Sequence, residues 1–463
     1  MRIVYLCMLL LSKFYLFGQP FVHIGTIAVE GNKKTRSEII QRELLFQEHD
    51  SIPATELTEL FRKSEQMLMN TGLFSRVFVN ESRRTADNTV EVKVIVSEAW
   101  YLYPVPLFEL ADRNFNVWWV EQNRSLQRVN FGMEFAHLNI SGRMDRLKIG
   151  FKHGYTHNYS IKYTLPYINR QQTIGISAEA SFARNKEVNY ATEGNKQLFY
   201  RDEHQFLYAT FRTELGLTYR PAARSFHNFY ISYHQNQVSD IIVNELNPSF
   251  FLNGRSIQRY LSFNYQFTYD NRDIRPYPLS GNYLSLRLER DGLDGFKDRD
   301  ALTLFAYYDQ YFSVSDRWSL ALKTGGKVSM IRNAQPYNDN RAFGFGKNYL
   351  HGYEYYVVDG LDMGFVKTNL RFQLLKEELG FGKIVPIQAF RRMPVKIYLS
   401  ANNDFGYVNE PFTGTTNFLN NRLLWGGGLG LDFVLYNDKV FQIEYSMNHL
   451  LERALFVNVN LNI

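Results

Sequence analysis

Two kinds of hydrophobic pattern follow each other along the chain. Between residues 21 and 97, VHIGTIAVEGN alternates, TRSEIIQRELL and ATELTELFRKSEQMLMNTG carry apolar residues at helical spacing, and FSRVFVNES and TVEVKVIVSEA alternate again. The second helical segment is expected to end at Gly72, because glycine readily takes the left-handed conformation that follows a helix. We therefore predict an α+β domain over residues 21–97 with the order strand, helix, helix, strand, strand.

From residue 100 to residue 463 the pattern is one of alternation alone. Sixteen such segments can be counted, namely YPVPLFELA, VNFGMEFAHLNI, LKIGFKHGY, YSIKYTLPY, TIGISAEASFA, QFLYATFRTELGLTY, NFYISYHQNQV, YLSFNYQFTYD, NYLSLRLERD, LTLFAYYDQYFSV, WSLALKTGGKVSMI, FVKTNLRFQLL, VKIYLSANNDFGYV, WGGGLGLDFVLY, FQIEYSMNHL and ALFVNVNLNI. An even number of antiparallel strands closes a barrel with both chain ends on one side.

The last segment shows the alternation most plainly. Its apolar residues share one face of the expected strand, and its asparagines share the other: Leu455, Val457, Val459, Leu461 and Ile463 against Asn458, Asn460 and Asn462. A soluble sandwich would turn the apolar face inward, whereas a membrane barrel turns it outward to lipid. Alternation alone does not choose between the two.

Composition and the N-terminus favour the membrane barrel. The chain has 31 Tyr and 37 Phe among 463 residues, interleaved with polar residues. The start, MRIVYLCMLLLSKFYLFGQP, has the basic residue, short apolar run and small residue of a secretory signal peptide, with cleavage expected near Gly18. A signal anchor is the competing interpretation, although the run is shorter than the ~20 residues of a spanning helix. We expect a signal peptide at residues 1–19 and an all-β 16-stranded antiparallel transmembrane barrel at residues 100–463.

Charge and motifs argue against most other functions. The net charge of +6 is spread along the chain rather than gathered in a basic helix, so no nucleic-acid partner is expected. The only cysteine, Cys7, lies in the signal peptide. His153 and His157 are four residues apart in an expected turn with no third ligand nearby. GFGKN lacks the spacing of a phosphate-binding loop, and no catalytic elbow motif occurs. We expect no enzyme activity, no cofactor and no metal.

The sequence resembles a known superfamily in both parts. The run VEGNKKTRSEIIQREL and the stretch LMNTGLFSRVFV are similar to a POTRA domain, and the alternating region resembles the barrel of the outer-membrane assembly-factor superfamily, the BamA/TamA type or bacterial surface antigen family. Three stretches carry the barrel resemblance: YDNRDIRPYPLSG at 269–281, GFGKNYLHGYE at 344–354 and SANNDFGYV at 400–408.

The resemblance implies a set of site residues. The stretch 344–354 is similar to the tip of the sixth extracellular loop, where the family places an Arg that pairs with a strand-borne Asp inside the lumen; here the position is held by His351 and the Asp is Asp404. A histidine can make a weaker, pH-sensitive ion pair, or only a neutral hydrogen bond or a stack on Tyr353, and both interpretations stay open. The expected loop-tip lock comprises Leu350, His351, Gly352, Tyr353, Glu354, Asp404 and Gly406. The expected turn motif comprises Asp270, Arg272, Asp273 and Gly281.

The resemblance also implies a function. Such a protein receives client polypeptides in the periplasm through the edge of its POTRA sheet, here Phe74, Val77 and Val79, and uses a weak barrel seam, here Val457, Val459, Leu461 and Ile463. The expected partners are unfolded outer-membrane or secreted proteins, outer-membrane lipids and accessory lipoproteins, and the expected location is the outer membrane of a Gram-negative bacterium. A dedicated two-partner-type secretion pore and a passive channel are the alternatives. The single POTRA domain favours a helper role over that of the central assembly factor.

Overall fold

The structure is a computed structural model that describes residues 21–169, 171–222, 224–293, 295–346, 348–382, 392–412, 416–436 and 439–461. The expected signal peptide lies outside the described residues. The chain divides into two compact units, an N-terminal one that ends near Tyr103 and a larger one that holds most of the remaining residues. Each unit is described by itself below.

The N-terminal unit is a four-stranded sheet with two helices. Its elements are β1 (Phe21–Glu30), α2 (Ser37–Arg42), β2 (Ser51–Pro53), α3 (Leu57–Asn70), β3 (Phe74–Arg84) and β4 (Thr89–Glu98). The strand order is β2-β1-β4-β3, with β1 parallel to β4 and β3 antiparallel to it, so that β3 is an edge strand. The predicted order lacked β2, because three residues are too few to show alternation. Ile40 of α2, Leu68 of α3 and Val90 of β4 share one core, which both helices close over the sheet.

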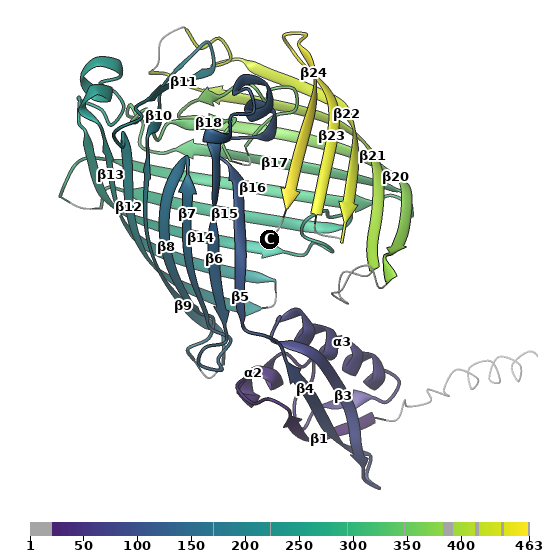
Figure 1. Cartoon of the computed structure of the whole chain (residues 1–463). Helices are drawn as coiled ribbons and strands as arrows, with labels where there is room; N and C mark the ends of the chain where they lie inside the picture. The colour runs from purple at the N-terminus through teal and green to yellow at the C-terminus, as the bar shows by residue number, and fades with distance from the viewer. Residues whose placement is uncertain are drawn as a thin grey trace, which may run out of the picture. The chain divides into compact units, whose positions relative to one another are not determined.

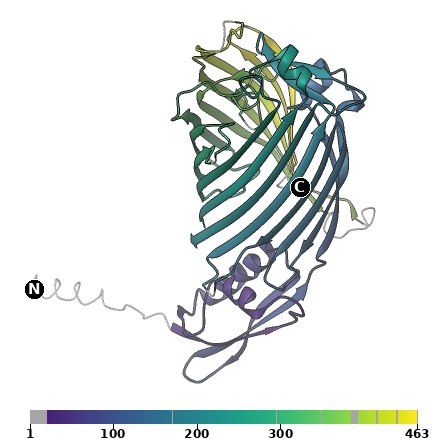
Figure 2. The same cartoon turned by 90° about the vertical axis from the view of Figure 1, so that its left-hand side faces the viewer.

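The larger unit is one sheet of 16 strands that follow each other in chain order (Figures 1 and 2). The strands are β5 (Leu102–Leu110), β6 (Val129–Leu138), β7 (Arg146–Gly154), β8 (Thr156–Leu165), β9 (Ile174–Asn185), β12 (Tyr208–Ala222), β13 (Ser225–Val238), β14 (Ile257–Asp270), β15 (Gly281–Asp291), β16 (Ala301–Ser313), β17 (Trp318–Ser329), β20 (Asp362–Gly380), β21 (Arg392–Asn409), β22 (Leu423–Leu435), β23 (Lys439–Asn448) and β24 (Arg453–Leu461). Each of the predicted alternating segments coincides with one of them, which confirms the predicted fold.

The polarity of this sheet is reversed relative to a soluble protein. On β21, Ser400, Asn402 and Asp404 are buried inside the barrel, while Leu399 and Phe405 are 44% and 40% exposed on the outside. On β23, Glu444 and Ser446 are buried, whereas Tyr445 is 55% exposed. Polar side chains inside and apolar side chains outside are the arrangement of a barrel surrounded by lipid, so the tertiary structure decides between the two interpretations that alternation left open.

Several short elements have no signal in the alternation. A hairpin of β10 (Glu187–Glu193) and β11 (Lys196–Arg201) lies between β9 and β12, and β18 (Arg341–Phe343) pairs with β19 (Val358–Asp359) between β17 and β20. Short helical turns occupy Val117–Glu121 and Ile242–Leu246. These elements lie in the connections 111–128, 186–207, 239–256 and 330–361, which share one end of the antiparallel barrel. The connections at the other end, such as 223–224, 271–280 and 314–317, are shorter.

Candidate functional site

The connection 330–361 folds back so that its tip is buried in the barrel. Leu350 is 1% exposed and packs in one core with Phe343 of β18, Val408 of β21 and Leu424 of β22. A side chain at Gly406 would meet Leu350, because a Cβ there would lie 2.6 Å from Leu350 Cδ1. The absence of a side chain at this position therefore leaves room for the tip.

His351 joins the tip to two strands. Its Nδ1 lies 2.7 Å from Asp404 Oδ2 on β21, and its backbone N–H donates to the same oxygen at 3.1 Å. Its Nε2 lies 3.3 Å from Glu444 Oε2 on β23. Burial by itself lowers the pKa of His351, but the two carboxylates raise it to about 9, so both ring nitrogens carry a proton at neutral pH. One interpretation of the sequence was that His351 stacks on Tyr353. The structure instead places the His351 ring edge-on to the ring of Tyr349, with 5.8 Å between the centroids.

Gly352 and Tyr353 continue the docking. Gly352 has a φ of +83°, and a Cβ there would come within 2.9 Å of the backbone of Met447 on β23. The Asn448 Nδ2 donates to the Gly352 carbonyl at 2.9 Å, and the Tyr353 hydroxyl donates to the Trp425 carbonyl at 3.0 Å. Only glycine fits position 352, since both its backbone angle and the approach of β23 exclude a side chain.

The strand beneath the tip also approaches closely. A Cβ on Gly426 of β22 would lie 1.9 Å from the His351 carbonyl oxygen. Glu354, the last of the expected lock residues in the loop tip, is 2% exposed, and burial raises the pKa of its carboxyl to about 8. The residues of the expected loop-tip lock are therefore brought together, and Glu444 and Gly426 join them. Glu444 was missed because many polar residues alternate onto the inner face of the barrel and spacing selects none of them.

A segment that follows β5 caps the free edge of β24. The Asn116 Nδ2 donates to the Val457 carbonyl at 3.2 Å, and the Val457 N–H donates to Asn116 Oδ1 at 2.8 Å. Asn116 is 4% exposed. One side-chain amide thus makes the pair of hydrogen bonds that a neighbouring strand would make at this residue. Nothing in the sequence distinguishes this asparagine from the others in the chain.

The same segment holds the loop tip. Asn114 Nδ2 donates to the Glu354 carbonyl at 2.8 Å, and Arg113 Nη1 donates to the Tyr356 carbonyl at 2.9 Å. The ring of Tyr355 lies 5.3 Å from that of Phe456 on β24. The tip, the segment 113–116 and the edge of β24 are therefore one connected set of contacts.

Four residues were expected at the barrel seam, and Val457 is the one that Asn116 contacts. Val459 is 44% exposed on the outer face. Leu461 ends β24, and Ile463 lies outside the described residues.

The edge strand of the N-terminal unit carries a comparable cap. Glu65 of α3 accepts a hydrogen bond from the Val79 backbone N–H through Oε1 at 2.8 Å. The side chains of Phe74, Val77 and Val79 are buried in the core, so a partner at this edge would meet their backbone rather than their side chains. Phe78, which points the other way, is 52% exposed.

The expected turn motif forms a compact ion-paired turn after β14. Arg272 donates to Asp270 through Nε at 2.8 Å and Nη2 at 2.9 Å, and Arg275 Nε lies 3.0 Å from the same carboxylate. Asp273 Oδ1 accepts from the Leu279 N–H at 3.1 Å. Gly281 has a φ of +95° and has no room for a Cβ, which would lie 2.1 Å from the Asn271 carbonyl oxygen.

This turn also reaches the barrel wall, which the sequence did not indicate. The Tyr277 hydroxyl donates to Asp432 Oδ2 on β22 at 2.6 Å, and Ser400 of β21 donates to the other oxygen at 3.0 Å. Arg371 of β20 donates to the Pro278 carbonyl at 2.7 Å. The turn is therefore tied directly to β22 and β20, which are distant from it in the sequence.

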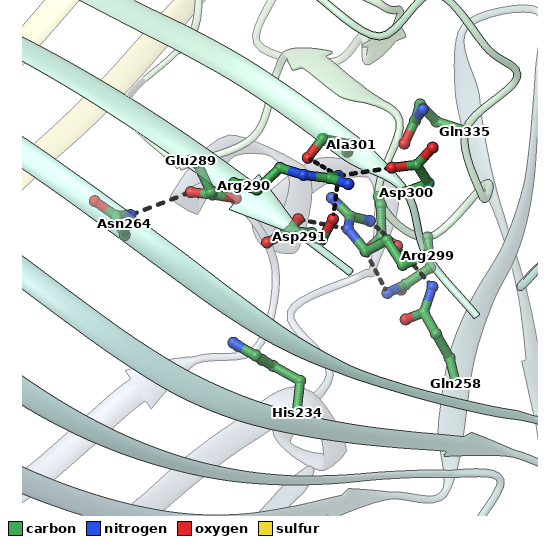
Figure 3. A network of polar contacts seen from close by, with 12 residues as sticks. His234, Gln258, Asn264, Glu289, Arg290, Asp291, Arg299, Asp300, Ala301 and Gln335 are labelled. Carbon is green, nitrogen blue, oxygen red and sulfur yellow. Dashed lines mark hydrogen bonds and ion pairs between the residues drawn. The ribbon is translucent and has the colours of Figure 1, made fainter. Parts of the chain in front are cut away.

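A further polar network anchors the loops at the other end of the barrel (Figure 3). Arg299 Nε donates to Asp291 Oδ2 at 2.5 Å, and its guanidinium also pairs with Asp339. Gln258 Nε2 donates to Asp339 at 3.0 Å. This network ties the connections 292–300 and 330–340 to β14 and β15, so it supports the base of the connection that carries His351.

The described part of the chain contains no group of three or more His, Cys, Asp or Glu side chains arranged to hold a metal ion. The rings of His153 and His157 lie 4.8 Å apart. Within the described ranges, no helix is long and apolar enough to cross a membrane.

Comparisons with known proteins agree with this architecture. Residues 22–99 match the POTRA family, described as a surface antigen variable number repeat, and residues 139–433 match the Omp85 superfamily domain. No curated protein matches the sequence.

Solved structures with the same fold include BamA from Haemophilus ducreyi lacking POTRA domains 1–3, with 12% identity, a TM-score of 0.58, and coverage of 95% of this chain and 83% of that one. They also include CdiB from Escherichia coli, with 11% identity, a TM-score of 0.56 and coverage of 94% and 75%. CdiB from Acinetobacter baumannii shows 15% identity, a TM-score of 0.53 and coverage of 95% and 73%.

Proposed function

The chain belongs to the Omp85 superfamily, and from this we propose that it binds unfolded polypeptides and helps them to insert into the outer membrane or to cross it. The observation that carries the proposal is that two strand edges are capped by single side chains. Glu65 caps β3 at Val79, and Asn116 caps β24 at Val457. An edge strand offers unpaired N–H and C=O groups, and a polypeptide in extended conformation satisfies them whatever its side chains are.

A single side chain is a weak competitor for such an edge. A neutral hydrogen bond, as in the Asn116 cap, contributes about 0.5–1.5 kcal/mol net, and a bond to a charged acceptor, as in the Glu65 cap, about 1.5–3 kcal/mol. Either cap is therefore worth less than a ladder of several residues. A client strand can therefore displace the cap without an external source of energy. The caps also cover an edge that would otherwise pair with any exposed strand.

The edge of β3 is the proposed first contact. Its inward side chains are occupied by the core, so recognition there rests on the backbone and does not select a sequence. The edge of β24 is the proposed second contact, where the apolar outer face of a client strand would continue the apolar outer face of β24.

We expect the Glu65→Ala variant to capture more client at β3 than the wild type. A photo-crosslinking amino acid at Phe78, which is exposed, reports the capture of an unfolded outer-membrane barrel protein. Removal of a charged acceptor from the Val79 N–H should raise crosslinking by about tenfold or more, because a hydrogen bond to a charged group is worth ~1.5–3 kcal/mol and about 1.4 kcal/mol is a factor of ten. Glu59→Ala is the matched control, since Glu59 lies on the same helix and pairs with Arg62 instead. Equal crosslinking in the wild type and both variants would contradict the role of Glu65 as a cap.

We expect the Asn116→Ala variant to free the edge of β24. With the crosslinking amino acid at Leu455, which is exposed on this strand, client capture should rise severalfold because both hydrogen bonds to Val457 are lost. Asn116→Asp keeps the acceptor for the Val457 N–H but loses the donor, so it should fall between the two. Gln122→Ala, in the same segment, is the control. Lower or unchanged capture in Asn116→Ala would show that the amide does not compete with clients.

Depletion of the protein distinguishes this function from the alternatives. Assembly of clients predicts that a defined set of outer-membrane barrel or surface proteins falls in abundance. Loss of one exported protein alone would point to a dedicated secretion pore, and planar-bilayer conductance with an unchanged outer-membrane proteome would point to a passive channel. The passive-channel result would overturn the proposal, and loss of one exported protein alone would restrict it to the passage of that protein across the membrane.

A further inference from the structure

The outer wall of the barrel has a groove between β7, β8, β9 and β12. Its volume is about 570 Å³, and its walls are apolar side chains that point away from the barrel interior: Ile149, Phe151, Tyr159, Ile161, Phe182 and Phe211. The groove is deepest at Ala180, which shares the outward face of β9 with Phe182 but has only a methyl side chain. The groove is therefore a shallow, open apolar depression on the lipid-facing side of the wall.

A cationic and aromatic cluster lies at one end of this groove. The Tyr159 hydroxyl and His153 Nε2 are 3.2 Å apart, and the His153 ring is 4.8 Å from the ring of His157. The His157 ring meets Phe206 edge-on at 5.1 Å, and the Arg184 guanidinium lies 3.9 Å over the same phenyl ring. These contacts form a continuous path from the apolar groove to a positive charge.

The charges of this cluster have no carboxylate partner in the described part of the chain. Within the described residues neither Arg184 nor Lys186 forms a salt bridge. Lys186 donates to the backbone carbonyl of Glu203 and lies 5.9 Å over the ring of Phe206. The buried Nε of Arg184 has no hydrogen-bond acceptor among the described residues. A half-buried guanidinium with unused donors is suited to a phosphate, which it can bind through two parallel N–H groups.

The position of the cluster identifies the leaflet. His153 and His157 flank the turn between β7 and β8, and Arg184 is near the end of β9, so the cluster lies at the barrel end that carries the long connections. In outer-membrane barrels the long connections are extracellular and the short ones periplasmic. The groove runs from the cluster toward the middle of the membrane, which matches a lipid of the outer leaflet with its phosphate at the cluster and its acyl chains in the groove.

We propose that this groove is a binding site for lipid A, with Arg184 and Lys186 holding a phosphate, and His153, His157 and Phe206 completing the headgroup end. The acyl chains lie along Ile149, Phe151, Ile161 and Phe182, over Ala180. This site is independent of the strand edges and of client handling; it requires only that the barrel lies in the outer membrane.

Native mass spectrometry of the purified full-length protein tests the site, with lipid A as the probe. After detergent exchange the wild type should retain bound lipid A. The double variant Arg184→Gln/Lys186→Gln should bind it at least about tenfold more weakly, because both charge-assisted contacts to the phosphate are lost. Ala180→Phe should weaken binding independently by filling the groove. Heat-modifiable gel mobility confirms that each variant keeps its barrel.

The matched control is Arg259→Gln. Arg259 is an exposed arginine on β14 at the same barrel end and lies 5.1 Å over Phe296, but it does not border the groove. This variant should bind lipid A as the wild type does. Equal retention in the wild type and the double variant, an equal loss in Arg259→Gln, or equally tight binding of phosphatidylglycerol at the same residues would overturn the proposal.

Discussion

Replacement of His351 with alanine is expected to release the tip of the connection 330–361 from the barrel interior. The change leaves Asp404 and Glu444 buried without the cation that both ring nitrogens of His351 supply. Removal of one partner from a buried ion pair costs about 3–5 kcal/mol. Lys367 Nζ lies 3.9 Å from Asp404 Oδ2 and remains in the variant, so we expect a cost at the lower end of this range. Trypsin cleavage at Arg341, in the same connection, should become faster, and the temperature at which the barrel loses its compact gel mobility should fall.

The variant His351→Arg is the informative counterpart. A guanidinium has enough donors for both carboxylates and is charged at every relevant pH, so protection of the tip should equal or exceed that of the wild type. His227→Ala serves as the control, because His227 pairs with the Tyr265 hydroxyl on the barrel wall. If His351→Arg and His351→Ala were both as protected as the wild type, the pair with Asp404 would contribute nothing to docking of the tip.

The same ion pair makes docking of the tip depend on pH. The pKa of His351 is about 9 in the folded protein, above its ordinary value of 6.5, so its contribution is fully present below about pH 6.5 and is lost as the pH rises through about 9. The raised pKa of Glu354, about 8, acts in the same direction, because its ionisation with rising pH places an additional charge in a buried site. Trypsin protection of the wild type should therefore fall toward alkaline pH, and His351→Arg should lose the part of this dependence that comes from the imidazole.

Replacement of Gly426 with alanine is expected to displace the same tip by a steric route. The new Cβ would lie 1.9 Å from the His351 carbonyl oxygen, a contact with backbone that no side-chain rotation can relieve. Overpacking of a tight site costs ~1–3 kcal/mol, and displacement of the tip would also separate His351 from Asp404. The measurement is again trypsin cleavage at Arg341.

Another strand of the barrel offers a matched control for this substitution. Gly364 of β20 has no atom within 4 Å of a built Cβ, so Gly364→Ala changes the same residue type without a contact. Protection of the tip should persist in Gly364→Ala and fall in Gly426→Ala. Equal protection in both variants would mean that the tip does not rest on β22 as closely as the structure has it.

The sequence predicted those parts of the fold that depend on residues close together along the chain. Alternation is a property of neighbouring residues, and lipid on one side and polar side chains on the other impose it on every barrel strand, so all sixteen segments could be recognised singly. The short strands β2, β18 and β19 could not, because two or three residues carry no period. The hairpin of β10 and β11 was missed for a different reason: it lies outside the membrane wall, where no second environment enforces the alternation.

The residues of the site also fall into those that local motifs indicated and those that only tertiary contacts bring together. Local sequence, together with the family resemblance, indicated His351, Gly352 and Asp404, because these residues lie in stretches that resemble family motifs. Glu444, Gly426 and Asn116 became part of the site only when curvature of the sheet brought β22, β23 and β24 against the loop tip and the segment after β5. The caps on the strand edges depend on one side chain reaching one backbone group across a distance that no pattern encodes.

By itself, the sequence therefore predicted an α+β domain followed by sixteen alternating strands, and composition and the N-terminus favoured a membrane barrel over a sandwich. The glycine-containing loop tip was indicated by the family resemblance. The tertiary structure alone decided that the polar face of the strands points into the barrel and which carboxylates bind His351. It also decided which side chains cap the edges of β3 and β24. The physical reason is that strand formation is governed by the environment of adjacent residues, whereas ion pairs and edge caps are governed by contacts between residues that are neighbours only after the sheet has curved.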